Sequence, residues 1–234
     1  MSNAIDLELK HQFPHWQQYP NYLPYVGTGY GENANRILII AESHYLPKEF
    51  NHKIKAKDWY LHPEKTFELF EELKAKVNPL SWMHTRKVVK YYIENKPKSG
   101  GLSIFHKLEE AYKEVYRGTS LLEHCLYMNY FQRPSEVSGD SIVVHPIDSD
   151  YALNALLAVN EVLKPNKIIF VSSKAYKTFK KSVSKEQLES FDYVGSVPHP
   201  SASSWWNRKS PKYGIDGGLA TGREKFERII KPKK

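Results

Sequence analysis

The chain contains almost no cysteine: Cys125 is the single one among its 234 residues. One cysteine excludes an internal disulfide and leaves no thiolate cluster for zinc or an iron–sulfur centre. The chain also lacks any run of about 18 apolar residues and any apolar segment typical of an export signal near its N-terminus. We therefore expect a cytoplasmic protein that is not bound to a membrane.

The charge of the chain is strongly positive. Its 34 Lys and Arg residues outnumber its 26 Asp and Glu residues, which gives a formal net charge of +8. This excess favours polyanionic partners such as nucleic acid. The ten histidines form neither a His-Glu-x-x-His motif nor a paired Cys/His spacing, so no metal site and no other cofactor is expected.

Short apolar runs alternate with longer stretches of helical periodicity. The predicted buried strands are 37–40, 125–130, 167–171 and 193–197. The predicted helices are 63–77, 86–93, 102–116, 149–163 and 174–181. This alternation predicts a three-layer α/β/α sandwich with a mainly parallel four-stranded central sheet. The 234 residues form one expected domain, with residues 1–30 as an extended arm rich in proline and aromatic residues.

Polar residues follow three of the predicted strands. Ala41-Glu42-Ser43-His44-Tyr45 comes after the first strand, Asn129 lies at the end of the second, and His199-Pro200-Ser201 follows the last. In open α/β folds, functional sites lie at the carboxyl ends of parallel strands. We therefore expect these three segments to converge on one site.

The order of these segments resembles that of the uracil-DNA glycosylase superfamily. Residues 41–45 look like the family's first motif, which reads Gly-Gln-Asp-Pro-Tyr-His in one branch and Gly-Glu-Ala-Pro-Gly in another. His199-Pro200-Ser201 looks like its last motif, and Asn129 falls at its base-reading asparagine. The resemblance covers roughly residues 25 to 230. It implies a role in base excision during DNA repair, on single- or double-stranded DNA, by a monomer without a cofactor.

The resemblance also implies a role for each motif residue in hydrolysis of an N-glycosidic bond. His199 would donate a hydrogen bond to the departing base, and Asn129 would recognise the edge of the flipped base. Tyr45 would stack on that base. Glu42 and Ser43 would assist catalysis, and His44 and Ser201 would contact the substrate. For each residue, a structural role in a turn or in the core is the alternative from the sequence alone.

The segment after the last motif carries features suited to DNA binding. Trp205 and Trp206 would insert into the duplex, and Arg208 and Lys209 would contact phosphates. Packing of the two tryptophans against the N-terminal arm is the alternative.

Two other functions compete with the glycosylase interpretation. Ser43 occupies the position of the water-activating aspartate in the common branch, and the cysteines of the iron–sulfur branch are absent. A catalytically weak or inactive nucleic-acid-binding module of the same fold is therefore the main alternative. A serine hydrolase using Ser43 is less favoured because the Gly-x-Ser-x-Gly motif is missing.

Overall fold

A five-stranded sheet lies at the centre of the computed structural model, which describes residues 3–32, 35–73, 79–214 and 218–231. The strands are β1 (Tyr25–Val26), β2 (Ile37–Ala41), β3 (Cys125–Asn129), β4 (Lys167–Phe170) and β5 (Val194–Ser196). Their order across the sheet is β1-β3-β2-β4-β5. β2, β3, β4 and β5 are parallel, whereas β1 pairs with β3 in the antiparallel direction.

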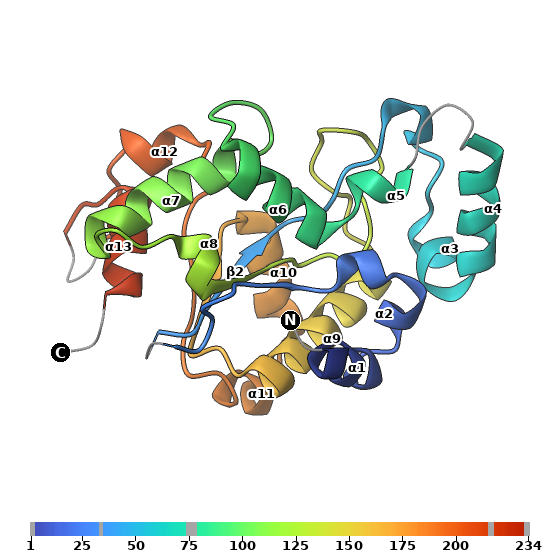
Figure 1. Cartoon of the computed structure of the whole chain (residues 1–234), viewed down its shortest axis with the longest axis horizontal. Helices are drawn as coiled ribbons and strands as arrows, with labels where there is room; N and C mark the ends of the chain where they lie inside the picture. Colours follow the sequence, from blue (N-terminus) through green and yellow to red (C-terminus); the bar gives the residue numbers. More distant parts are fainter. Residues whose placement is uncertain (1–2, 33–34, 74–78, 215–217, 232–234) are drawn as a thin grey trace.

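One face of the sheet is covered by α1 (Asn3–Gln12), α9 (Pro146–Leu163) and α10 (Ser173–Ser182). Leu38 and Ile40 of β2 point to this face and share an apolar cluster with Leu156 of α9 and Phe179 of α10. Figure 1 shows α1 lying beside α9 at the lower edge of the molecule, and the two helices are in contact. Burial of this face joins the N-terminal segment to the second half of the chain.

The opposite face is covered by α6 (Thr85–Asn95), α7 (Ser103–Val115), α12 (Ser203–Trp206) and α13 (Gly222–Ile230). Ile37 and Ile39 alternate with the residues that face α9, as the two-residue period of a strand requires. They pack in one cluster with Phe105 of α7 and Phe226 of α13. The upper left of Figure 1 shows α7, α12 and α13 grouped together. Helices therefore lie on both faces of the sheet.

The remaining helices are short or lie at the rim of the sheet. They are α2 (His15–Gln18), η1 (Pro20–Tyr22), η2 (Lys48–Phe50), α3 (Ala56–Leu61), α4 (Pro63–Leu73), α5 (Pro79–Trp82), α8 (Leu121–His124) and α11 (Lys185–Glu189). The predicted helix 63–77 corresponds to α4 as far as Leu73, and its last residues lie outside the described residues. None of the described helices is long and apolar enough to cross a membrane.

The predicted α/β class is confirmed, but the predicted four-stranded sheet is incomplete. Strand β1 lies within the segment that we expected to be an extended arm, and it adds an antiparallel edge. Gly27, directly after β1, lies so close to the backbone of α8 that a Cβ atom would lie 2.3 Å from the carbonyl oxygen of Glu123. The arm itself is largely helical, with Trp16 and Tyr22 buried in the core. Burial of these aromatic rings, as expected, attaches the arm to the body of the protein.

Candidate functional site

The parallel strands bring four loops to one edge of the sheet. The loops begin after Ala41, Asn129, Phe170 and Ser196, and Ala41 is in register with Asn129. β2 lies between β3, which follows it in the chain, and β4, which the chain reaches after crossing over β2. Ligands bind at such points of reversal because the two neighbouring loops separate and leave a crevice. The loops after β2 and β4 therefore mark the candidate site.

The side chain of Glu42 accepts three hydrogen bonds at this edge. Its Oε2 accepts a hydrogen bond from the Ser172 hydroxyl at 2.7 Å. Its Oε1 accepts a hydrogen bond from the backbone N–H of Ile142 at 3.2 Å and a second one from the Ser141 hydroxyl. Glu42 thus joins the loop after β4 to the long loop after β3, and its carboxylate remains an acceptor in a fixed position.

His199 lies in the loop after β5 with its imidazole oriented by the backbone. The N–H of Ser201 donates a hydrogen bond to Nδ1 of His199 at 3.1 Å. Desolvation lowers the pKa of His199 and Lys107 lowers it further, while the carboxylate of Glu42 acts in the opposite direction. A neutral ring whose Nδ1 is an acceptor carries its proton on Nε2. His199 is exposed and presents an Nε2–H donor.

Asn129 ends β3 on the face that Tyr127 also occupies, because side chains alternate along a strand. Its side chain is only 6% exposed, and its amide has no hydrogen-bond partner within the part of the chain that the structure describes. The backbone carbonyl of Asn129 is already used, since it accepts a hydrogen bond from Gln132 Nε2 at 2.8 Å. The amide atoms of Asn129 are not among the enclosed side-chain atoms that lack a partner in the described residues, so they are open to water or a ligand.

Tyr45 lies beside the Glu42 network. It is 39% exposed, and desolvation followed by the charges of Glu42 and Asp140 raises its pKa. Tyr45 in turn contributes to the raised pKa of Tyr127, after the larger effect of burial. The ring therefore has an accessible surface next to the strand that carries Asn129. The structure brings Glu42 within electrostatic reach of both Tyr45 and His199.

Ser43 and His44 occupy different environments. The Ser43 hydroxyl is buried and has no hydrogen-bond partner among the described residues. His44 is buried, its Nε2 lies 2.9 Å from the Thr85 hydroxyl, and its ring packs edge-on against Tyr22. Desolvation lowers the pKa of His44 to about 3, with a smaller contribution from His84. His44 thus holds the loop onto α6, and substrate contact does not fit its position.

The expected DNA-binding segment divides into buried and exposed parts. Trp205 is fully buried against Phe226 of α13, so insertion into a duplex does not fit its position. Trp206 is partly exposed, and the Arg223 guanidinium lies 4.9 Å from the centre of its ring. Arg208 and Lys209 are exposed, and Lys209 pairs with Glu224 at 3.9 Å. Packing of Trp205 occurs against α13 and not against the N-terminal arm.

Three site residues were missed by the sequence reasoning. Ser141 and Ser172 are isolated serines in loops, and nothing in their spacing relates them to Glu42. Lys174 donates a hydrogen bond to the carbonyl of Ile142 at 2.5 Å, which adds a second contact from the region after β4 to the same loop. Only Ser172 could have been predicted, from its place directly after the predicted strand 167–171. In the structure it N-caps α10.

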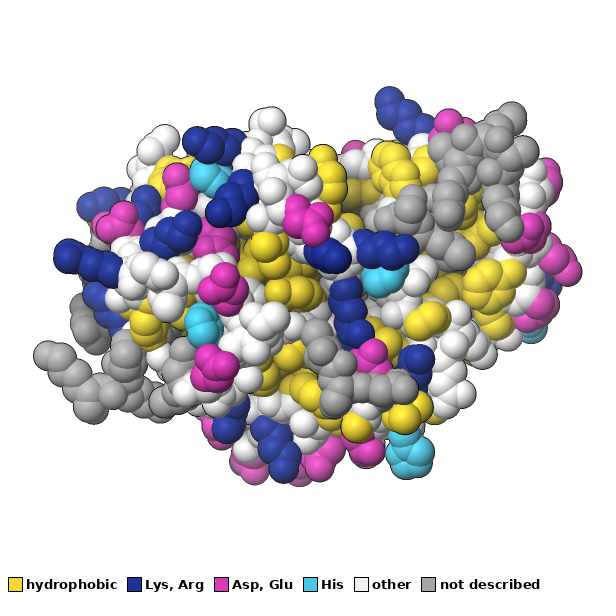
Figure 2. Space-filling model, in the orientation of Figure 1, with side chains coloured by type: hydrophobic (Ala, Val, Ile, Leu, Met, Phe, Trp, Pro, Cys, Tyr) yellow, Lys and Arg dark blue, Asp and Glu magenta, His cyan; other side chains and the backbone are white. Residues whose placement is uncertain are grey.

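Surface charge around the site is mixed. Figure 2 shows Lys and Arg side chains over the end of the molecule that carries α7, α12 and α13, interspersed with Asp and Glu. Among the described residues, no group of three or more His, Cys, Asp or Glu side chains is arranged to hold a metal ion. No family model, no curated protein and no solved structure matches this chain.

Proposed function

We propose that this protein binds a nucleotide with its base flipped out, at the carboxyl edge of the sheet, and hydrolyses its N-glycosidic bond as uracil-DNA glycosylases do. The observation that carries the proposal is the hydrogen bond from the Ser201 N–H to Nδ1 of His199. This bond fixes the tautomer in which Nε2 is the donor. A donor fixed in advance is what the departing base requires, because negative charge develops on its carbonyl oxygen as the bond breaks.

The protonation state of His199 supports this role. Its lowered pKa keeps the ring neutral at physiological pH, with Nε2–H available. Protonation of Nδ1 would remove the acceptor of the Ser201 N–H, so the hydrogen bond that holds residues 199–201 in their turn would be lost. In the proposed reaction the base leaves with the bonding electron pair, and His199 stabilises the resulting anion through its hydrogen bond.

Asn129 and Tyr45 supply recognition in this proposal. The Asn129 amide offers one acceptor and two donors, which suits the edge of an imide-containing base such as uracil. This amide forms no hydrogen bond to another described side chain or backbone group and is not enclosed, which supports a position open to a ligand. The accessible ring of Tyr45 provides a stacking surface, and stacking of a base on an aromatic side chain contributes about 1–3 kcal/mol.

Water activation falls to Glu42 in this proposal. Its Oε2 accepts one hydrogen bond among the described residues and keeps a lone pair for water, whereas Oε1 accepts two. Water adds to the sugar carbon as the bond to the base breaks, and Glu42 accepts the proton of that water. Ser43 lies in the same loop and carries no charge. Its buried hydroxyl has no hydrogen-bond partner among the described residues.

Base release from labelled single- and double-stranded oligonucleotides containing uracil tests the proposal. We expect His199→Ala and Asn129→Ala each to reduce release by about two to three powers of ten, as loss of one transition-state donor does. His62→Ala is the matched control, since His62 also precedes a proline but lies at the start of α4. Equal rates in His199→Ala and the wild type would overturn the assignment.

A base-binding module without turnover is the second candidate. It is favoured by the replacement of a carboxylate by Ser43 and by the engagement of Glu42 in three hydrogen bonds. For this candidate we expect no release of base, together with oligonucleotide binding that weakens steeply with salt. Asn129→Ala would then weaken binding of uracil-containing strands more than binding of strands without uracil.

A further inference from the structure

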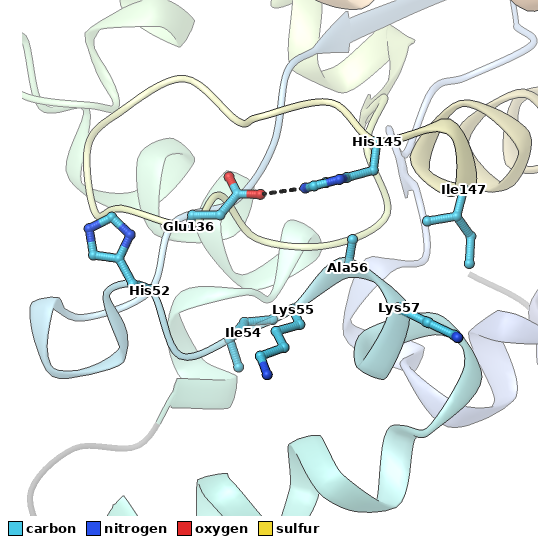
Figure 3. A pocket seen from close by; sticks show the side chains of 8 residues that line it. All are labelled: His52, Ile54, Lys55, Ala56, Lys57, Glu136, His145 and Ile147. Carbon is cyan, nitrogen blue, oxygen red and sulfur yellow. Dashed lines mark ion pairs between the residues drawn. The ribbon is translucent and has the colours of Figure 1, made fainter.

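A concave site lies beside the long loop after β3 that Glu42 holds. It is a pocket of about 380 Å³ formed by the segment 52–57, by Glu136, and by the start of α9. Figure 3 shows these side chains around the pocket, with His145 directed at Glu136. Its volume falls in the range of small-molecule sites. The lining residues are His52, Ile54, Lys55, Ala56, Lys57, Glu136, His145 and Ile147.

The lining of this pocket combines apolar surface with four basic side chains. Lys55 and Lys57 are exposed, and within the described residues neither has a carboxylate at ion-pair distance. His52 and His145 add two imidazoles. Glu136 is the one acid among these lining residues, and its negative charge would oppose that of the lysines if it were unpaired.

The charge of Glu136 is already committed to protein groups. Its Oε1 accepts a hydrogen bond from the buried Arg133 at 2.6 Å, and its Oε2 accepts one from the N–H of Val143 at 2.9 Å. Although burial opposes ionisation, these two groups lower the pKa of Glu136. His145 lies 3.8 Å from the same carboxylate, and Arg133 also pairs with Asp148. Because Glu136 is hydrogen-bonded to Arg133 and no carboxylate of the described residues lies at ion-pair distance from Lys55 or Lys57, the two ammonium groups remain available to a ligand.

Hydrogen bonds between segments fix the walls of the pocket in advance. The N–H of His52 donates to the carbonyl of Glu136 at 2.7 Å, and the N–H of Ser138 donates to Oδ1 of Asn51 at 2.9 Å. His52 has a left-handed backbone with φ of 60°, a conformation that the surrounding contacts must hold. A pocket that is already formed binds a ligand without the cost of ordering its walls.

We propose that this pocket binds the phosphate group of a nucleotide, with Lys55 and Lys57 as the charged contacts. Lysine binds phosphate as a point charge, and two lysines on one segment suit a group with several equivalent oxygens. The buried Ile54 and Ala56 add an apolar surface for the organic part of the ligand. The phosphate comes either from a free nucleoside monophosphate or from a DNA strand that runs past the loop after β3.

Isothermal titration calorimetry on the full chain distinguishes these sources. The probes are inorganic phosphate, a nucleoside monophosphate, the same nucleoside without phosphate, and a short single-stranded oligonucleotide. The test variant is Lys55→Gln/Lys57→Gln. The control is Lys48→Gln/Lys53→Gln, which removes the same charge from exposed lysines of the preceding segment that do not line the pocket.

We expect the monophosphate, or the oligonucleotide, to bind the wild type and the nucleoside not to bind. The test variant should lose at least about tenfold in affinity, and the control should stay within about twofold of the wild type. Equal losses in both variants, or no binding of any phosphate-bearing probe, would overturn the proposal. This proposal is independent of the proposed glycosylase function, because none of the residues that line the pocket belongs to the site of Glu42, Asn129 and His199.

Discussion

The hydroxyl of Ser172 donates a hydrogen bond to Oε2 of Glu42 at 2.7 Å, and so connects the first residue after β2 with the loop after β4. Ser172 also accepts a hydrogen bond from the N–H of Ala175 and thereby caps α10. One serine therefore ties a helix start, a strand end and an acidic side chain together. These hydrogen bonds keep the carboxylate of Glu42 in one position.

The first prediction concerns the three hydrogen bonds of Glu42. Glu42→Gln replaces one acceptor oxygen by an NH₂ group, so at least one donor among Ser141, Ile142 and Ser172 loses its partner. We expect the free energy of unfolding to fall by about 1–3 kcal/mol and hydrogen exchange of the Ile142 amide to accelerate. Denaturant unfolding and exchange measurements check this. Glu189→Gln, on the exposed α11, is the control and should change neither quantity.

The second prediction concerns the buried ion pair between Arg133 and Asp148. Arg133 Nε donates to Asp148 Oδ1 at 2.6 Å, and both side chains are fully buried. Asp148→Ala leaves Arg133 with only Glu136 as a charged partner, so we expect a loss of about 3–5 kcal/mol in unfolding free energy. Asp150→Ala, two residues further along α9 and exposed, should change stability by less than about 0.5 kcal/mol. Similar losses in the two variants would contradict the structural role of the pair.

The third prediction separates the two adjacent tryptophans. Because Trp205 is completely buried against Phe226, Trp205→Ala should cost about 3–5 kcal/mol in unfolding free energy. Trp206→Ala removes a partly exposed ring and its contact with Arg223, so its cost should stay near 1 kcal/mol. Thermal and denaturant unfolding compare the two. A larger loss for Trp206→Ala would contradict the burial pattern.

The fourth prediction concerns the pH dependence of stability. Burial lowers the pKa of His15 to about 4 and that of His44 to about 3, so both are neutral in the folded protein. Below the unfolded value of 6.5, the unfolded chain takes up protons that the folded chain excludes. Stability should therefore fall as the pH decreases from about 6.5 to about 5, by at most about 2 kcal/mol for each histidine.

Carboxyl groups titrate at lower pH and do not contribute to this change in stability. Asp6 and Glu136 have lowered pKa values in the folded protein, and their stabilising effect is lost only below the unfolded values of 3.8 and 4.5. His44→Gln keeps a side chain that can bond to Thr85 but does not titrate. Denaturant unfolding at pH values of about 7, 6 and 5 should give a smaller slope for this variant. An unchanged slope would contradict the neutral state of His44.

Strands in the sheet centre were predictable because burial on both faces demands continuous apolar residues. Ile37–Ala41 meets this demand and forms β2 close to the expected boundaries. Strand β1 was not predictable, since two residues carry no periodicity and its pairing with β3 depends on contacts distant in sequence. Helix α1 was missed because prolines after Gln12 dominated the interpretation of the N-terminal segment.

Residues of the candidate site were predictable where a strand end located them, as for Glu42 and Asn129. Their contacts were not predictable, because the hydrogen bond between Glu42 and Ser172 joins residues that neighbour each other only in the folded sheet. His44 and Trp205 illustrate the opposite difficulty. The sequence does not show whether a histidine or tryptophan near a motif faces a ligand or the core. Only its burial in the folded protein distinguishes the two.

The antiparallel pairing of Tyr25 with Tyr127 joins two segments that are about a hundred residues apart, so β1 cannot pair before β3 has been synthesised. A ribosome releases α1 and β1 well before β3 and α9, against which they pack. Until then, buried aromatic side chains of the first segment, such as Trp16 and Tyr22, lack much of their surroundings. The aromatic residues of the N-terminal segment therefore stay without these partners until the chain has been synthesised as far as α9, which makes this stretch of synthesis the one most exposed to aggregation through them.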